Sequence, residues 1–155
     1  MKTLLKNAIV ISPQSPYHST QQDILISSGI IEQISENIEP DKETAVYTFN
    51  NLHVSCGWFD SGVSFGEPGY EERETLSNGL EVAARSGFTK ILLNSNTHPI
   101  PDSKSTVGHL IKMSQDLTTS LYPIGALTIE SKGDQMASLY AVSYTHLRAH
   151  ETRHD

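Results

Sequence analysis

The seven histidines are the side chains of this 155-residue chain with the clearest potential for metal chemistry. His146, His150 and His154 are spaced four residues apart, so a helix would place their imidazoles on one face. Such a face would mimic a site for a divalent ion. The other four histidines have no companion at ligand spacing, and we expect them to be solvated or hydrogen-bonded rather than catalytic. These four are His18, His53, His98 and His109.

The segment around the three spaced histidines differs from the rest of the chain. Residues 142–155 hold three of the seven histidines, and the stretch from Ser143 to Thr152 resembles translated sequencing-adapter read-through. We therefore expect residues 142–155 to be a non-native tail rather than a metal site. On this interpretation, the spacing of His146, His150 and His154 has no functional meaning.

The charge balance and the single cysteine narrow the class of protein. Eleven Lys and Arg stand against 18 Asp and Glu, giving a net charge of -7, and no basic cluster is present, which argues against nucleic-acid binding. Cys56 cannot form an internal disulfide, and we expect it to be a buried, inert thiol. With no signal-peptide pattern and no apolar run of membrane length, the chain is expected in the cytoplasm, without membrane contact.

Two different patterns of elements follow each other along the chain. The first part, residues 1–53, has short apolar runs separated by turn signals, which favour a small β-sandwich. Its second and third strands flank Ser27-Ser28-Gly29, the spacing of a tight hairpin in which the glycine takes a positive φ. The runs predicted as strands are Leu4–Ile11, Asp23–Ile26, Ile30–Ile34 and Ala45–Phe49.

The second part, residues 54–141, alternates strands and helices. A parallel sheet with right-handed crossovers follows from this order. We expect an acidic first turn in the first helix, Gly87 just after its end, and a fully buried second strand. Strands are predicted at Val54–Phe59, Phe88–Leu93 and Leu121–Ile129, helices at Glu71–Ser86 and Ser103–Ser120, and a glycine-rich loop at Gly62–Gly69.

In such architectures the chemistry lies on loops after the carboxyl ends of the strands, which directs attention to the stretch after Phe59. Residues 57–75 read GWFDSGVSFGEPGYEERET. This resembles the signature of the dihydroorotases, in which a strand ending G-F-x-D runs into x-H-x-H-x-R-E-P-G and an acidic helix start. Further matches in the same order are Gly87-Phe88-Thr89, Asn96-Thr97-His98-Pro99 and Ile124-Gly125-Ala126-Leu127-Thr128.

The resemblance spans roughly residues 3–141 and carries expectations about fold. It implies an α/β chain with an N-terminal β-sandwich segment followed by the first βα units of an incomplete TIM barrel. A closed barrel needs about 250 residues, so this length leads us to expect a fragment of a longer protein. The domains expected are thus 1–53, 54–141 and the tail 142–155.

The departures from the signature bear on chemistry. Where the family's two histidines bind zinc, this chain has Gly62 and Ser64, and neither supplies an imidazole. Where the family's arginine clamps the substrate carboxylate, this chain has Gly66. Asn96 remains at a position that the resemblance implies is substrate-binding. Asp60 also remains, either as part of a site or as a structural carboxylate.

We therefore expect a dihydroorotase-like chain of pyrimidine synthesis that has no catalytic residue and no metal ligand of its own, and so is inactive as it stands. The resemblance leaves two alternatives open. One is a non-catalytic scaffold or regulator that binds aspartate carbamoyltransferase. The other is an amidohydrolase of the same superfamily acting on a different small cyclic amide.

Overall fold

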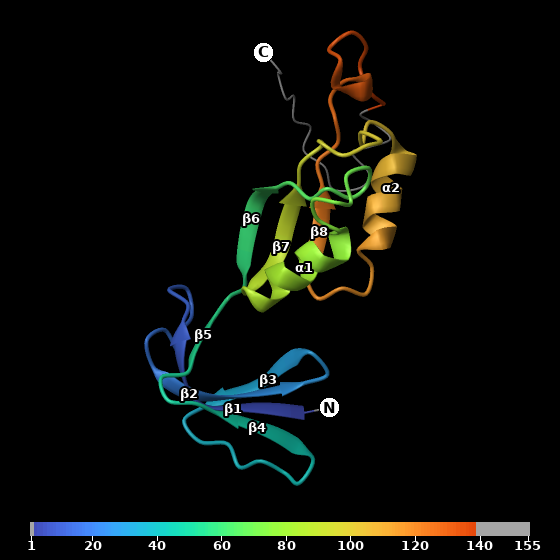
Figure 1. The fold of residues 1–155 in the computed structure, drawn as a ribbon. Coiled ribbons are helices and arrows are strands. Elements are labelled where there is room, and N and C mark those ends of the chain that lie inside the picture. Colours follow the sequence, from blue (N-terminus) through green and yellow to red (C-terminus); the bar gives the residue numbers. More distant parts are fainter. Residues whose placement is uncertain (1, 139–155) are drawn as a thin grey trace. The chain divides into compact units, whose positions relative to one another are not determined.

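The computed structural model describes residues 2–138, and within this range the chain divides into two compact units. The division lies between Cys56 and Gly57, a few residues after the expected boundary. Figure 1 shows a sheet in the first unit and a mixed sheet and helix arrangement in the second. The segment 142–155, with its three spaced histidines, lies outside the described residues.

The first unit is one five-stranded sheet of order β3-β2-β1-β4, with β5 also pairing with β1. β1 pairs antiparallel with β2 and parallel with β4 and β5. A sandwich needs two sheets packed face to face, and the described residues of this unit form only one. The strands are β1 (Lys2–Ile11), β2 (Gln21–Ser27), β3 (Ile30–Ser35), β4 (Thr44–Thr48) and β5 (His53–Ser55).

The predicted hairpin is confirmed. β2 and β3 pair antiparallel, with Ser27 opposite Ile30. The two residues between them, Ser28 and Gly29, have φ values of 50° and 79°, as a two-residue turn with left-handed backbone requires. The turn therefore sets the register of the two strands.

A buried carboxylate organises the first unit. Asp23 is fully buried, and its carboxylate accepts hydrogen bonds from Lys6 Nζ (2.6 Å) and from the backbone N–H groups of Asn7 and Ile38 (2.9 Å each). Burial alone would raise the pKa of Asp23, but the Lys6 ammonium and the two backbone donors outweigh it and lower the pKa. Asp23 thus ties β1 to the segment after β3.

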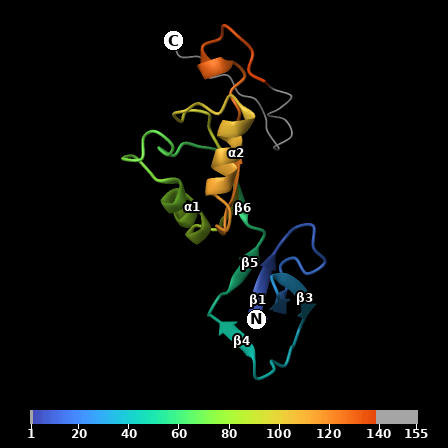
Figure 2. The same cartoon turned by 90° about the vertical axis from the view of Figure 1, so that its right-hand side faces the viewer.

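The second unit has a three-stranded parallel sheet of order β6-β7-β8. α1 and α2 lie side by side in both views and share one apolar cluster with the sheet, so the predicted strand–helix alternation is confirmed (Figures 1 and 2). The elements are β6 (Trp58–Val63), α1 (Leu76–Arg85), β7 (Phe88–Leu93), α2 (Lys104–Met113), β8 (Ser120–Pro123) and the 3₁₀ turn η1 (Ile129–Ser131). The cluster is formed by Leu76, Leu80, Ile91, Leu93, Leu110 and Leu121.

Several predicted boundaries in this unit are wrong. The run Val54–Phe59 is not one strand: β5 ends at Ser55 in the first sheet, and β6 begins at Trp58 in the second. At Gly57 the backbone lies so close to Thr89 that a Cβ would be 2.0 Å from its Cγ2. An apolar run in the sequence cannot reveal such a close approach.

Both helices are shorter than predicted. α1 begins after Thr75, whose hydroxyl accepts the Asn78 N–H, so no acidic residue lies in its first turn. Its end is as predicted, with Gly87 at a φ of 87°. α2 begins after Ser103, which forms a capping box with Thr106, and it ends at Met113.

The strand predictions differ in burial and length. In β7 only the carboxyl half is deeply buried, since Thr89 and Lys90 are exposed while Ile91 and Leu93 are 1% exposed. β8 ends at Pro123, and the remainder of the predicted strand is a loop followed by η1.

Across residues 2–138, no helix is long and apolar enough to cross a membrane.

Candidate functional site

The carboxyl ends of β6, β7 and β8 lie at one edge of the parallel sheet, where the loops to the helices begin (Figure 1). Near the end of β6, the residues on either side of Val63 differ from it in burial. Val63 packs against the apolar cluster, while Gly62 and Ser64 are exposed. The two positions at which the family resemblance leads us to expect histidines are therefore both open to solvent.

Ser64 joins the first strand end to the second. Its Oγ accepts a hydrogen bond from Asn94 Nδ2 (3.0 Å) and another from Asn96 Nδ2 (3.1 Å). Asn94 directly follows β7, and its backbone N–H donates to the carbonyl of Val63 (2.9 Å). Asn96, the substrate-binding residue expected from the sequence, is therefore held beside Ser64, and Asn94 is a member of the cluster that sequence reasoning missed.

The Asp60 carboxylate binds the backbone of its own strand. Its Oδ1 accepts the backbone N–H of Gly62 (3.0 Å), which bends β6 where its pairing with β7 is irregular, between Asp60 and Val63. An extra residue at such a point is a β-bulge, which redirects the side chains that follow. The carboxylate therefore shapes the turn that presents Ser64.

Gly66 lies in a closed loop rather than in an open cleft. Its N–H donates to the Glu74 carbonyl (3.0 Å), and its own carbonyl accepts the Tyr70 N–H (2.9 Å). A Cβ at Gly66 would lie 1.8 Å from the Tyr70 carbonyl oxygen, a separation that no side chain tolerates. The backbone has closed over the place where the family resemblance expects an arginine.

The acidic first turn that we expected for the first helix is not present, and the glutamates before α1 have another role. Glu67 and Glu71 precede α1 and bind loop backbone instead of lying in the first helical turn. Glu67 Oε2 accepts the N–H of Leu76 (2.6 Å), and Glu71 Oε1 accepts the N–H of Gly69 (2.8 Å). The Gly69 hydrogen bond lowers the pKa of Glu71. These carboxylates stabilise the loop and the start of the helix.

The residues present do not fit zinc at the first strand end. Gly62 has no side chain, and the Ser64 hydroxyl is a neutral group already bound by two amides. Within residues 2–138, no three His, Cys, Asp or Glu side chains are close enough together to hold a metal. A Cβ at Gly62 would meet nothing nearer than Asn94 Oδ1 at 3.7 Å, so the space for a ligand remains while the ligand is missing.

The other candidate residues are dispersed. His53 Nδ1 lies 2.7 Å from the Asn51 carbonyl in the first unit, and His18 Nδ1 accepts the Ser12 N–H. His98 donates its backbone N–H to Pro68 and thereby joins the two loops. Cys56 is exposed, which contradicts the expected burial of its thiol.

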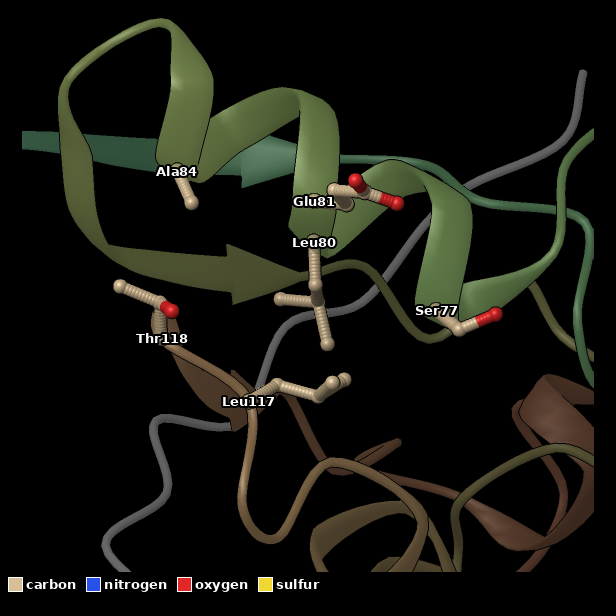
Figure 3. A pocket seen from close by; sticks show the side chains of 6 residues that line it. All are labelled: Ser77, Leu80, Glu81, Ala84, Leu117 and Thr118. Atoms are coloured by element: carbon tan, nitrogen blue, oxygen red, sulfur yellow. The ribbon is translucent and has the colours of Figure 1, made fainter.

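Two pockets in the second unit are large enough to be considered as places for a ligand. One, of about 180 Å³, is lined by Ser77, Leu80, Glu81, Ala84, Leu117 and Thr118, and the Leu80 and Leu117 side chains point toward each other in it (Figure 3). It is mostly apolar and lies away from the strand ends. A larger one, of about 420 Å³, lies beside the loop after β7 and is lined by His98, Pro99, Ile100, Asp102 and Glu130.

Comparisons with known proteins agree with the family resemblance. The sequence profile of the family described as dihydro-orotase-like matches residues 32–149, most of the chain. The chain belongs to the dihydroorotase-like family. This match includes part of the 142–155 segment, whose predicted foreign origin remains a prediction.

Individual dihydroorotases are similar over most of this dihydroorotase-like chain. The dihydroorotase of Acetivibrio thermocellus is 34% identical over 137 residues, 88% of this chain and 32% of that protein. That of Fusobacterium nucleatum is 34% identical over 122 residues, 78% of this chain and 28% of its own. The chain thus spans about a third of the length of the curated relatives it matches.

Solved structures show the same fold. The L-hydantoinase of Arthrobacter aurescens superimposes with a TM-score of 0.73 at 20% identity, covering 93% of this chain and 30% of that one. A dihydroorotase superimposes with a TM-score of 0.60 at 13% identity, covering 96% and 41%. The mixed α/β fold of this chain is therefore shared with these two proteins.

Proposed function

We propose that this chain is part of a dihydroorotase-like cyclic amidohydrolase of pyrimidine synthesis, placed in the cytoplasm, that binds a cyclic amide but does not hydrolyse it. The observation that carries the proposal is the Ser64 cluster. The hydroxyl that replaces a metal-binding imidazole is engaged by Asn94 and Asn96. A stable polar cluster at this point supports a site remodelled away from metal binding.

The chemistry of the family supports the loss of activity. Hydrolysis of a ring amide at neutral pH needs an activated water, which a metal supplies by lowering the pKa of that water. At the end of β6 this chain offers only Gly62, a neutral hydroxyl and Asp60, whose Oδ1 is bound by backbone. None of these groups activates water as bound zinc does.

We also propose that β6, β7 and β8 are the first three strands of a TIM barrel. Their parallel order with intervening helices and the likeness to amidohydrolase structures support it. In such a barrel the Ser64 cluster would face the mouth, where barrel enzymes bind their ligands.

Ring opening of dihydroorotate is the direct test of inactivity. The protein is expressed at the greatest length available that contains this sequence, and it is assayed with added zinc. The Acetivibrio thermocellus dihydroorotase serves as the positive control. We expect no turnover above the uncatalysed rate. Turnover that a chelator abolishes would overturn the proposal of inactivity.

A scaffold role is the second candidate, favoured by the absence of imidazoles at Gly62 and Ser64 on a chain that keeps the family's fold. The partner expected is aspartate carbamoyltransferase, and its class follows only from the family resemblance. Co-sedimentation of the two proteins tests it, with the catalytically intact dihydroorotase as a reference. Absence of a complex at concentrations where the reference pair does associate would favour the inactive binder, and a complex would support the scaffold.

A further inference from the structure

The Ser64 hydroxyl fixes the orientation of two amide side chains at the carboxyl ends of the parallel strands. Both Asn94 and Asn96 turn their Nδ2 toward Ser64 Oγ, at 3.0 and 3.1 Å. Each amide has a second N–H and a carbonyl oxygen besides the N–H that Ser64 uses. Each of the two amides therefore has one N–H donor and one carbonyl acceptor left for a ligand.

Such an amide matches the edge of a ring amide. In a cyclic amide the ring holds the N–H and the C=O on the same side, so the edge offers a donor beside an acceptor. An asparagine side chain binds this kind of edge with two parallel hydrogen bonds, as it does at adenine in DNA recognition. Neither partner needs a charge for this contact.

The surroundings disfavour an anion. The strand ends and loops of this edge, residues 57–72, 91–103 and 121–131, contain no lysine or arginine. They contain six acidic residues, and a cation directly follows each range: Arg73, which stacks over the Tyr70 ring at 4.6 Å, Lys104, and Lys132, which pairs with Glu130. The acidic residues are Asp60, Glu67, Glu71, Glu72, Asp102 and Glu130.

The family resemblance leads us to expect an arginine at position 66, and the geometry of the loop leaves no room for one. Gly66 cannot carry a side chain, because its Cβ would lie 1.8 Å from the Tyr70 carbonyl oxygen. A carboxylate brought to this edge would meet amide N–H donors but no cationic side chain at position 66, which lowers its affinity.

We infer that Ser64, Asn94 and Asn96 form a binding site for an uncharged cyclic amide, and that the site rejects the same ring carrying a carboxylate. This inference rests on the proposed binding function and specifies its ligand class. Asn94 and Asn96 contact the ring edge, and Ser64 is a positioning residue that holds both amides.

A matched pair of rings tests the inference. Dihydrouracil and dihydroorotate share one ring and differ by a carboxylate. Each is titrated into the ¹⁵N-labelled chain while the side-chain amide signals of Asn94 and Asn96 are followed by NMR. We expect dihydrouracil to shift these signals and dihydroorotate to bind at least about tenfold more weakly.

Variants separate positioning from general surface effects. Ser64→Ala removes the acceptor of two hydrogen bonds, and we expect dihydrouracil affinity to fall about fivefold to tenfold, whereas Ser64→Thr keeps a hydroxyl and retains most of the binding. Ser61→Ala changes an exposed serine of β6, three residues before Ser64, and should leave the affinity unchanged.

Two results would overturn the inference: dihydroorotate binding as tightly as dihydrouracil, or no shift of the two amide signals with either ring. Ring opening is measured in the same samples. Turnover would contradict the proposed inactivity, and the order of the two affinities would still decide the ligand class separately.

Discussion

Gly66 is a residue at which backbone geometry alone decides what chemistry the loop can support. Its N–H and C=O are both bound within the loop, to Glu74 and Tyr70. Adding a methyl group there forces the Tyr70 carbonyl to move. An arginine at this position would have to open the loop before it could bind anything.

We predict that Gly66→Ala destabilises the second unit by about 2 kcal/mol or more, since the loop must rearrange around the new Cβ. Gly108→Ala is the matched control: Gly108 lies inside α2 with nothing within 4 Å of an added Cβ. That change should stabilise by about 0.5–1 kcal/mol. Urea unfolding followed by circular dichroism measures both, and equal effects of the two changes would contradict the closed loop.

Asp23 gives a prediction for the first unit. Asp23→Asn removes the charge that faces Lys6 Nζ and should cost about 2 kcal/mol. Asp41→Asn, which alters the exposed pair of Lys2 and Asp41, should cost much less.

The pH dependence follows from the lowered pKa of Asp23. A carboxyl with a depressed pKa in the folded state contributes stability that is complete above its unfolded pKa, near 4, and is lost as the pH falls through the folded value. The loss of stability between about pH 4 and pH 2 should therefore be smaller in Asp23→Asn. Unfolding curves across this range check the slope, and parallel curves would contradict the role of Asp23.

At the scale of elements, the sequence predicted most of the strands and both α-helices, but it merged β5 with β6, missed η1 and did not show where several elements end. Alternating apolar patterns and turn residues located the hairpin at Ser28-Gly29 and the end of α1 at Gly87, because these signals are local. The break at Gly57 and the closure on Gly66 depend on contacts with Thr89 and Tyr70, which are fixed only after folding. The Ser64 cluster was missed for the same reason, since its amides come from the next strand.

The start of α1 depends on a carboxylate from the loop. Glu67 Oε2 accepts the N–H of Leu76 (2.6 Å), an N–H that no residue within the helix can satisfy. We predict that Glu67→Ala destabilises the second unit by about 1 kcal/mol and speeds hydrogen exchange of the first turn of α1. Glu72→Ala, an exposed glutamate in the same loop, serves as control. Unchanged exchange at Leu76 in Glu67→Ala would show that another group caps the helix.

At the scale of the whole chain, both described sheets have edge strands. β6 and β8 flank the second sheet, and Trp58 and Phe59 on β6 are 63% and 55% exposed. Open edges with exposed aromatic side chains favour pairing between chains. We predict concentration-dependent self-association, measured by sedimentation, with Phe59→Lys reducing it. A monomer with strong hydrogen-exchange protection across residues 88–128 would contradict this.

At the scale of the whole chain, zinc binding is the property in which we expect the largest departure from what the family resemblance implies. It can be measured as metal content after dialysis of three chains. The chain ending at Ala141 should retain no stoichiometric zinc, because Gly62 and Ser64 supply no imidazole and no other group of ligands gathers in residues 2–138. The chain as given should bind zinc only weakly, through the spacing of His146, His150 and His154.

The third chain adds Gly62→His and Ser64→His to the one ending at Ala141. Space for a side chain exists at Gly62, so this variant should gain zinc affinity, but two imidazoles are half of a tetrahedral set and the metal should be lost on prolonged dialysis. One equivalent of zinc retained by the unsubstituted chain ending at Ala141 would mean that another residue completes a site. His98, whose backbone already joins the loops after β6 and β7, would then be the first side chain to replace.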